Sequence, residues 1–281
     1  MTPIIIQGLL PAKSAVEDQE RMPLRVTEIS RQDFNELVYS RAGEFMERVN
    51  APEAFVVTAF YDSDRIRELR NAAFQTGMTS DASWHPLHDD CPDYHRLHDN
   101  YPKAHVKQKM HAFYYHGWYP HNKDKFDFFS DIFAMKNFLA GYPETEFLGN
   151  IPSDRFIARV NIHHYPRGGG YQAEHIDPVG KHAQIQTLVA ASEFGRDYSA
   201  GGVFARSAAG AEKEYVDPYM KPGDLLVMSP GIHHGVDPVD PDAAYEWQSN
   251  DGRWMILPII VSSDYPNPEA TKPVQVGTAA T

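Results

Sequence analysis

The stretch HHYPRGGGYQAEHIDP, residues 163–178, decides how this sequence folds. A β-branched and aromatic run over 156–165 leads into a glycine-rich turn, and the pair His175 and Asp177 follows. On an extended backbone, residues i and i+2 point to the same side of the strand. The imidazole and the carboxylate can therefore reach one point in space and provide two ligands for a metal ion.

A second histidine cluster offers the third ligand. Residues 230–239 read PGIHHGVDPV, and His234 lies 59 residues after His175, at a distance that suits a neighbouring strand. Adjacent strand residues face opposite ways, so only one of His233 and His234 points inward. The alternation alone leaves this choice open, and the family resemblance described below favours His234 through the pattern His-x-Val-x-Pro-Val. Two imidazoles and one carboxylate leave three positions of an octahedral ion open, which indicates a catalytic metal of the non-haem Fe(II) type.

Arg253 lies 19 residues after His234 and opens a predicted strand over 254–261. A planar guanidinium binds a carboxylate in bidentate fashion, so this arginine suits the remote carboxylate of a dicarboxylic co-substrate. The alternative is an ion pair with a nearby acid such as Asp251. Arg159 and Arg167 are further cations close in sequence to the predicted site, and either could contact a substrate or a co-substrate.

The composition excludes several classes of partner. Among 281 residues there are 26 Lys and Arg against 38 Asp and Glu, so the net charge is −12. Without a basic run, the chain lacks the electrostatic footprint for nucleic acid or an anionic membrane surface. The one cysteine, Cys91, permits no internal disulfide and no cysteine-based zinc site. The N-terminal sequence has no signal-peptide pattern and no apolar run long enough to span a bilayer, so we expect a soluble, cytoplasmic protein.

The first half of the chain mixes helices with a strand. Apolar spacing predicts helices over 31–48, 64–77 and 124–140, and a strand over 55–60. Residues 84–122 contain eight histidines and show no clear period, so we expect a long, ordered, irregular segment. Its aromatic residues suggest a hypothetical substrate lid, made of Trp84, Tyr114, Tyr115, Trp118 and Tyr119.

The second half shows short strands separated by turn residues. They are predicted at 156–165, 185–191, 202–205, 214–216, 225–228 and 254–261. Even spacing of short strands with Gly and Pro between them is typical of a closed or double-layered antiparallel β structure.

Taken together, these motifs resemble the Fe(II)/2-oxoglutarate-dependent dioxygenase superfamily over roughly residues 155–262. The resemblance rests on His175-x-Asp177, the His234 motif and Arg253, with support from a Gly-Gly strand start at 201–202 and the PGDLL sequence at 222–226. It implies an α+β, mainly β fold, in which a distorted double-stranded β-helix (jelly roll, cupin-like) core carries N-terminal helices packed against it. We expect a covering part over 1–150, a catalytic core over 151–265 and a tail over 266–281.

The resemblance also implies roles for single residues. His175, Asp177 and His234 would bind Fe(II), and Arg253 would bind the distal carboxylate of 2-oxoglutarate. Met255 stands where a small hydroxyl residue is common in this superfamily, so a second contact to 2-oxoglutarate is expected from Tyr165 or Thr187.

The activity implied is that of a hydroxylase-type dioxygenase using Fe(II), 2-oxoglutarate and O2. It would oxidise an unactivated C–H bond of a small molecule, such as an amino acid or a natural-product intermediate, by hydroxylation, desaturation, epoxidation or cyclisation, and release succinate and CO2. Asp177 argues against halogenation, because related halogenases carry a small residue at that position.

Two other function classes stay open on the sequence. One is a cupin-like metalloenzyme that does not use 2-oxoglutarate, such as a ring-cleaving dioxygenase or an isomerase, which has no need of Arg253. The other is a metal-free β-sandwich binding module, for which the three predicted ligands would have no role.

Overall fold

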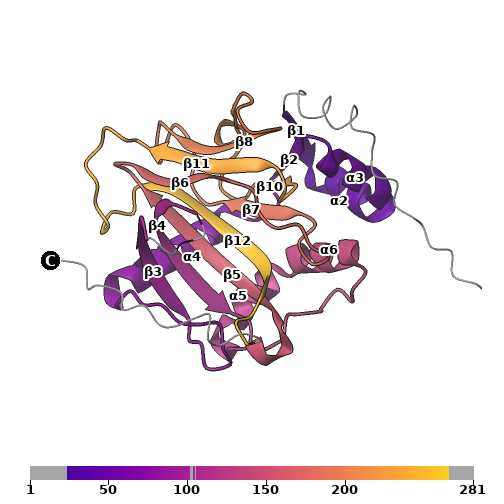
Figure 1. The fold of residues 1–281 in the computed structure, drawn as a ribbon, viewed down its shortest axis with the longest axis horizontal. Helices are drawn as coiled ribbons and strands as arrows, with labels where there is room; N and C mark the ends of the chain where they lie inside the picture. The colour runs from indigo at the N-terminus through magenta and orange to yellow at the C-terminus, as the bar shows by residue number, and fades with distance from the viewer. Residues whose placement is uncertain (1–23, 102–103, 105, 266–281) are drawn as a thin grey trace, which may run out of the picture.

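The computed structural model describes residues 24–101, 104 and 106–265, and within them twelve strands form one curled sheet (Figure 1). Its order is β1-β2-β10-β7-β12-β5-β4-β6-β11-β8-β9, with β3 paired to β4 beside this path. The strands are β1 (Arg25–Ser30), β2 (Glu53–Thr58), β3 (Tyr94–Asp99), β4 (Gln108–His116), β5 (Phe156–Pro166), β6 (Gly170–His175), β7 (Gln186–Ala190), β8 (Gly202–Arg206), β9 (Glu214–Tyr215), β10 (Leu225–Met228), β11 (His233–Val239) and β12 (Gly252–Ser262).

The curl divides the sheet into two layers, and β4 belongs to both. Its first residues, Gln108 and Lys109, pair with β6, whereas His111 to His116 pair with β5. In Figure 1, β6, β11 and β8 lie above β12, β5 and β4. Apart from the parallel pair of β1 and β2, neighbouring strands run antiparallel. Two such layers that share strands make a jelly roll, so the predicted double-stranded β-helix is confirmed. The predicted strands of the second half appear as β5, β7, β8, β9, β10 and β12.

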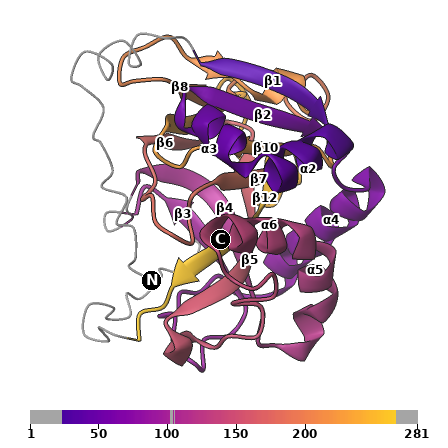
Figure 2. The same cartoon turned by 90° about the vertical axis from the view of Figure 1, so that its right-hand side faces the viewer.

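Five α-helices of the described residues cover the outer face of the layer that contains β1, β2, β10, β7, β12 and β5. They are α2 (Arg31–Ser40), α3 (Ala42–Asn50), α4 (Ser63–Thr79), α5 (Lys123–Phe128) and α6 (Ser130–Ala140), with short 3-10 turns at Pro120–Asn122, Pro152–Asp154 and Asp217–Tyr219. Figure 2 shows α2, α3 and α6 in front of the strands. Over the described residues, none of these helices is long and apolar enough to cross a membrane.

Local sequence explains where the helices begin and where two predicted helices break. The Ser30 hydroxyl accepts the Asp33 N–H at 3.1 Å, and the Asp62 carboxylate accepts the Arg65 N–H at 2.9 Å. The helix predicted over 31–48 divides at Arg41, whose φ of −133° and ψ of 42° are not helical. The helix predicted over 124–140 likewise divides at Phe129.

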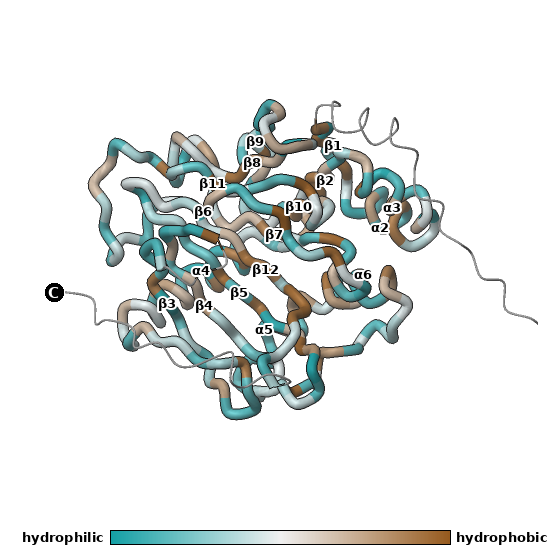
Figure 3. Tube along the Cα trace, in the orientation of Figure 1, coloured by the Kyte–Doolittle hydropathy of each residue, from teal (hydrophilic) through white to brown (hydrophobic). Residues whose placement is uncertain are grey.

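Side-chain alternation along the described strands creates two large apolar cores, beside a small cluster of Leu87, Cys91 and Ile157. One face of the strands shares a core with the helices, which contains Val160 and Phe133, and the other face forms a core inside the barrel, which contains Leu188 and Val236. Residues of β10 and β12 supply both cores, and their trace is largely brown in Figure 3. Burying one such side chain contributes about 1.5–3 kcal/mol.

Residues 84–122 differ from the prediction, because they contain β3 and β4. Histidines hid the strands β3 and β4, because they count as polar although His98 in β3 and His111 and His116 in β4 are buried with hydrogen-bond partners. Tyr114 and Tyr115 are part of the sheet and therefore do not belong to a lid.

Strands from the first 150 residues complete the sheet, since β2 pairs with β10 and β4 with β5. The division into three parts stays a prediction. The N-terminal stretch in which no signal peptide is expected and the predicted tail over 266–281 lie outside the described residues.

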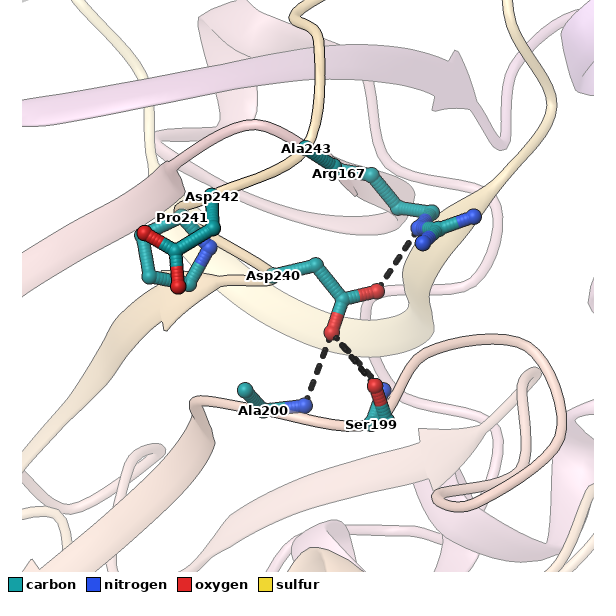
Figure 4. Close-up of a pocket in the computed structure, with 7 residues that line it drawn as sticks. All are labelled: Arg167, Ser199, Ala200, Asp240, Pro241, Asp242 and Ala243. Atoms are coloured by element: carbon teal, nitrogen blue, oxygen red, sulfur yellow. Dashed lines mark hydrogen bonds and ion pairs between the residues drawn. The ribbon is translucent and has the colours of Figure 1, made fainter.

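Asp240 fixes the corner where β5 turns into β6. It lines a surface cavity of about 330 Å³, drawn in Figure 4. Its carboxylate accepts the N–H groups of Ser199 at 2.9 Å and Ala200 at 2.8 Å, and the Nε–H of Arg167 at 2.7 Å. Although burial acts in the opposite direction, these bonds hold the pKa of Asp240 below its ordinary value. The corner therefore ties the glycine-rich turn to the end of β11.

Lys136 on α6 is a buried lysine that has no carboxylate partner among the described residues. Its side chain is 6% exposed, and Nζ donates to the carbonyl of Ile185 at 2.9 Å. Burial lowers the pKa of Lys136 to about 7. Because the unfolded chain keeps this proton to much higher pH, folding releases it between about pH 7 and 10. The free energy of unfolding therefore rises with pH within this window.

Substituting Lys136 with methionine tests this linkage. The free energy of unfolding of the native chain should rise relative to that of Lys136→Met by about 1.4 kcal/mol per pH unit between about pH 7.5 and 9.5. Chemical denaturation at several pH values measures it. Lys123→Met, at an exposed lysine on the neighbouring helix, is the control and should follow the native chain. Parallel pH profiles for all three proteins would show that Lys136 keeps its proton.

Candidate metal centre

The pairing of β6 with β11 brings the predicted ligands together. His175 and His234 are direct register partners, and their ring centroids lie 4.3 Å apart. Asp177 follows the end of β6, where its N–H donates to the carbonyl of Pro230 at 2.8 Å on the segment that enters β11. One ligand atom from each of the three side chains lies within 4.8 Å of the others.

Backbone carbonyls fix both imidazole rings in the orientation that a metal requires. The Nδ1–H of His175 donates to the carbonyl of Ala173 at 2.9 Å, and that of His234 to the carbonyl of Ile232 at 2.8 Å. Each Nε2 therefore presents a lone pair, and each lies 3.6 Å from a carboxylate oxygen of Asp177. Such outer hydrogen bonds are the usual support of histidine ligands.

Gln186, the first residue of β7, holds the third ligand. Its Nε2 donates to Oδ2 of Asp177, which orients the carboxylate. Gln186 was not among the site residues predicted from the sequence. The alternation of the strand predicted over 185–191 could have indicated it, because Gln186 lies on the same face as Leu188.

His233 faces away from this cluster. Its Nδ1 lies 3.1 Å from Oε1 of Glu174, which also pairs with Arg206. The preference for His234 over His233 thus agrees with the alternation along β11, and His233 takes part in a separate network on the outer face.

Arg253 opens β12 and is 4% exposed. Its Nε and Nη2 donate to the two oxygens of Asp217 at 2.7 and 2.9 Å, and its Nη1 lies 2.8 Å from the sulfur of Met255. Although burial opposes the charge, Asp217 raises the pKa of Arg253 above its ordinary value. The ion-pair partner is therefore Asp217 and not Asp251, and it binds the guanidinium through Nε and Nη2.

Asp217 is itself tightly placed. Its Oδ2 accepts the N–H of Val203 at 2.7 Å. A Cβ atom at Gly202 would come within 2.3 Å of the same oxygen, and Gly202 has a φ of +107°. Only glycine fits both requirements, which explains the Gly-Gly start of β8.

The structure separates the two residues expected as second 2-oxoglutarate contacts. Tyr165 lies inside the barrel, with its ring centroid 5.7 Å from Cζ of Arg253, and its hydroxyl donates to Oε1 of Gln172 at 3.1 Å. Burial raises the pKa of Tyr165. Thr187 lies on the face of β7 opposite to Gln186, where its hydroxyl donates to the carbonyl of Pro258 at 3.2 Å. Thr187 is therefore not brought together with the other site residues.

A row of polar side chains continues along the inner face of β5. Alternation places Arg159, Asn161 and His163 on the same face as Tyr165. Among the described residues, Oδ1 of Asn161, both ring nitrogens of His163 and Oε1 of Gln186 are buried without a hydrogen-bond partner. Burial, with smaller contributions from nearby cations, lowers the pKa of His163 to about 3, so its ring is neutral. We call Arg159, Asn161, His163 and Tyr165 of β5 the inner row.

No family model and no curated protein matches this sequence. Among solved structures, the chain is similar to a full-length Neurospora crassa protein in complex with alpha-KG and thymine, at a TM-score of 0.51 and 10% identity, over 84% of this chain and 86% of that one. A Trichoplax adhaerens prolyl hydroxylase bound to a hypoxia inducible factor peptide gives a TM-score of 0.46 at 12% identity, over 93% and 98% of the two chains. A Pseudomonas putida prolyl-4-hydroxylase gives 0.44 at 12% identity, over 78% and 97%.

At 10% identity, the similarity to the Neurospora structure shows the fold and not the reaction. The similarity to the Neurospora structure extends over most of both chains and agrees with the two-layered sheet described above. The chain has the double-stranded β-helix fold of the 2OG-Fe(II) oxygenases.

Proposed function

We propose that this protein is an Fe(II)- and 2-oxoglutarate-dependent oxygenase that hydroxylates a C–H bond of a small molecule. The observation that carries the proposal is the convergence of two Nε2 lone pairs and one carboxylate inside a jelly roll. Three protein ligands leave open positions on an octahedral ion, as the facial triad of non-haem iron enzymes does.

The donor set fits this ion. Both histidines are fixed by backbone carbonyls in the tautomer that binds a metal through Nε2, and Gln186 orients the carboxylate. When bound, Fe(II) would chelate the keto acid end of 2-oxoglutarate and activate O2. The remaining tasks, which are to hold the co-substrate, orient the substrate and exclude water, belong to the chain.

Arg253 is the residue proposed to hold the distal carboxylate of 2-oxoglutarate. Asp217 accepts from Nε and Nη2 and so orients the guanidinium, and the remaining N–H groups, one of which now points to the Met255 sulfur, are those proposed to donate to the ligand carboxylate. Tyr165 packs beside the guanidinium, and Met255 and Leu257 add apolar surface on the same inner face. A low-dielectric surrounding strengthens such charge-assisted bonds.

A small-molecule substrate agrees with the charge of the chain. At −12 it does not attract nucleic acid. The inner row offers polar atoms to a substrate, since Arg159 Nε, Asn161 Oδ1 and both ring nitrogens of His163 are buried without a hydrogen-bond partner. Oxidation of an amino acid or a natural-product intermediate is therefore our proposal.

Metal binding gives the first test. His175→Ala, Asp177→Ala and His234→Ala should each weaken Co(II) binding, measured anaerobically by absorption titration, by about 100-fold or more, since loss of even an outer partner costs about 10- to 100-fold. Thermal unfolding of the metal-free variants should match that of the native chain. His233→Ala is the matched control and should bind Co(II) normally. Loss of binding in His233→Ala, or retention in the other three, would remove the proposed ligand set.

The co-substrate site gives the second test. Anaerobic addition of Fe(II) and 2-oxoglutarate should produce a visible charge-transfer band, which Asp177→Ala abolishes. Arg253→Leu should raise the dissociation constant for 2-oxoglutarate by about 10- to 100-fold, because a charge-assisted contact is lost. For 2-oxobutanoate, which lacks the distal carboxylate, native chain and Arg253→Leu should have the same affinity.

Other outcomes distinguish the alternatives. Iron binding without a band would favour a cupin-like enzyme that does not use 2-oxoglutarate. Absence of iron binding would leave a metal-free binding module. Equal loss of affinity for both keto acids in Arg253→Leu would show that this arginine supports the fold of the site and does not contact the distal carboxylate.

A further inference from the structure

We propose that Arg159 and Tyr114 form an anion-binding end of the substrate pocket, and that the substrate carries a carboxylate which they bind. The inference rests on the proposed function and deepens it, since it names the chemical class of the substrate.

The position of Arg159 places it in the same interior as the candidate metal centre. It is the far end of the inner row, six residues from Tyr165, which pairs with Arg253. The two arginines are thus separated by about 20 Å along the strand. His163 lies between them, and both contribute to its lowered pKa.

The register of β7 and β12 relates Arg159 to the metal ligands. Met255 pairs with Ala190 and Ile256 with Val189, and continuing this register brings Gln186 level with Ile259. Ile259 is the direct partner of Arg159 on the other side of β12. Arg159 is therefore two strand spacings, about 10 Å, from Gln186, the residue that holds the Asp177 carboxylate.

The two inner arginines differ in their partners. Arg253 is paired with Asp217, whereas Arg159 makes no ion pair with any residue that the structure describes, and its Nε is buried without a hydrogen bond. Its guanidinium lies 4.9 Å from the ring centroid of Tyr114. A partly desolvated cation without a counter-charge is costly, so this arginine indicates an anion that arrives with the ligand.

A hydrogen-bonded chain sets the Tyr114 hydroxyl as a donor. Gln172 Nε2 donates to Gln108 Oε1 at 3.3 Å, and Gln108 Nε2 donates to Nδ1 of His98 at 3.0 Å. His98 therefore carries its proton on Nε2, which donates to the Tyr114 oxygen at 3.1 Å. Burial lowers the pKa of His98 to about 3 and raises that of Tyr114, so both stay neutral.

The Tyr114 O–H is left to donate beside Arg159. Within the described residues it has no acceptor, and Tyr114 is the register partner of Asn161 in the inner row. A guanidinium that offers parallel N–H groups, together with a phenol O–H, matches the oxygens of a carboxylate.

Pairs of acids and their primary amides test the proposal in solution. The anaerobic complex with Fe(II) and 2-oxoglutarate is titrated with hexanoate and hexanamide, phenylacetate and phenylacetamide, and N-acetylleucine and its amide, and the shift of the charge-transfer band is recorded. At least one acid should bind, and its amide should bind about 10-fold or more weakly. Arg159→Leu should abolish this preference, with a loss of about 10- to 100-fold in acid affinity.

Two further variants separate a contact from a general effect. Tyr114→Phe should weaken acid binding by about 3- to 10-fold, since one neutral donor is removed. Arg196→Leu, at an exposed arginine outside the barrel, should change nothing. The proposal is overturned if no acid shifts the band, if acids and amides bind alike, or if Arg159→Leu keeps the preference.

A crystallographic measurement separates failure of this inference from failure of the oxygenase proposal. Metal-free crystals soaked in bromide should show an anomalous peak against the Arg159 guanidinium, absent in Arg159→Leu. Peaks at exposed cations alone would mean an adventitious ion only and would overturn the anion site. If no charge-transfer band forms although iron binds, the oxygenase proposal fails, and the bromide peak still decides the anion site.

Discussion

The antiparallel pairing of β6 with β11 is the constraint on which the site depends. Because side chains alternate along a strand, a slip of one residue would turn a ligand histidine outward and bring His233 or Glu174 inward. The fold secures this register at both ends. At one end the N–H groups of Gly168 and Gly169 donate to the carbonyls of Asp240 and Val239, and at the other the N–H of Asp177 donates to the carbonyl of Pro230.

The two inner arginines, Arg253 and Arg159, differ in whether a carboxylate of the protein pairs with the guanidinium. Asp217 offsets the charge of Arg253, so at the proposed co-substrate site a carboxylate would be recognised through the direction of the N–H groups more than through net charge. Arg159 keeps its charge uncompensated among the described residues, so attraction of an anion dominates there. In a chain of net charge −12, an unpaired interior arginine is a strong local feature.

The triad could be derived from the sequence because its geometry is local. His175 and Asp177 need only the two-residue period of a strand, and the His234 motif carries its own spacing. Asp217 could not be derived, since it meets Arg253 only after β8 and β12 are brought together. Thr187 was expected near the co-substrate because the sequence does not tell which face of β7 points inward, and its bond to Pro258 shows that it faces the helices. The strands β3 and β4 were missed because buried histidines read as polar.

The strands β3 and β4, which the sequence did not predict, contribute to the proposed substrate end of the barrel. The resemblance extends over the C-terminal half, which supplies all three candidate metal ligands and Arg253. The proposed anion site takes Tyr114 from β4 and depends on His98 from β3, both within the segment whose period was obscured. The hydrogen-bonded chain through Gln108 and Gln172 joins this segment to Tyr165, and hence to the co-substrate end of the barrel. If the anion site is correct, a change in β3 would alter which substrate is accepted while the metal ligands stay in place, because β3 pairs with β4 and the candidate ligands belong to the β6 and β11 pair.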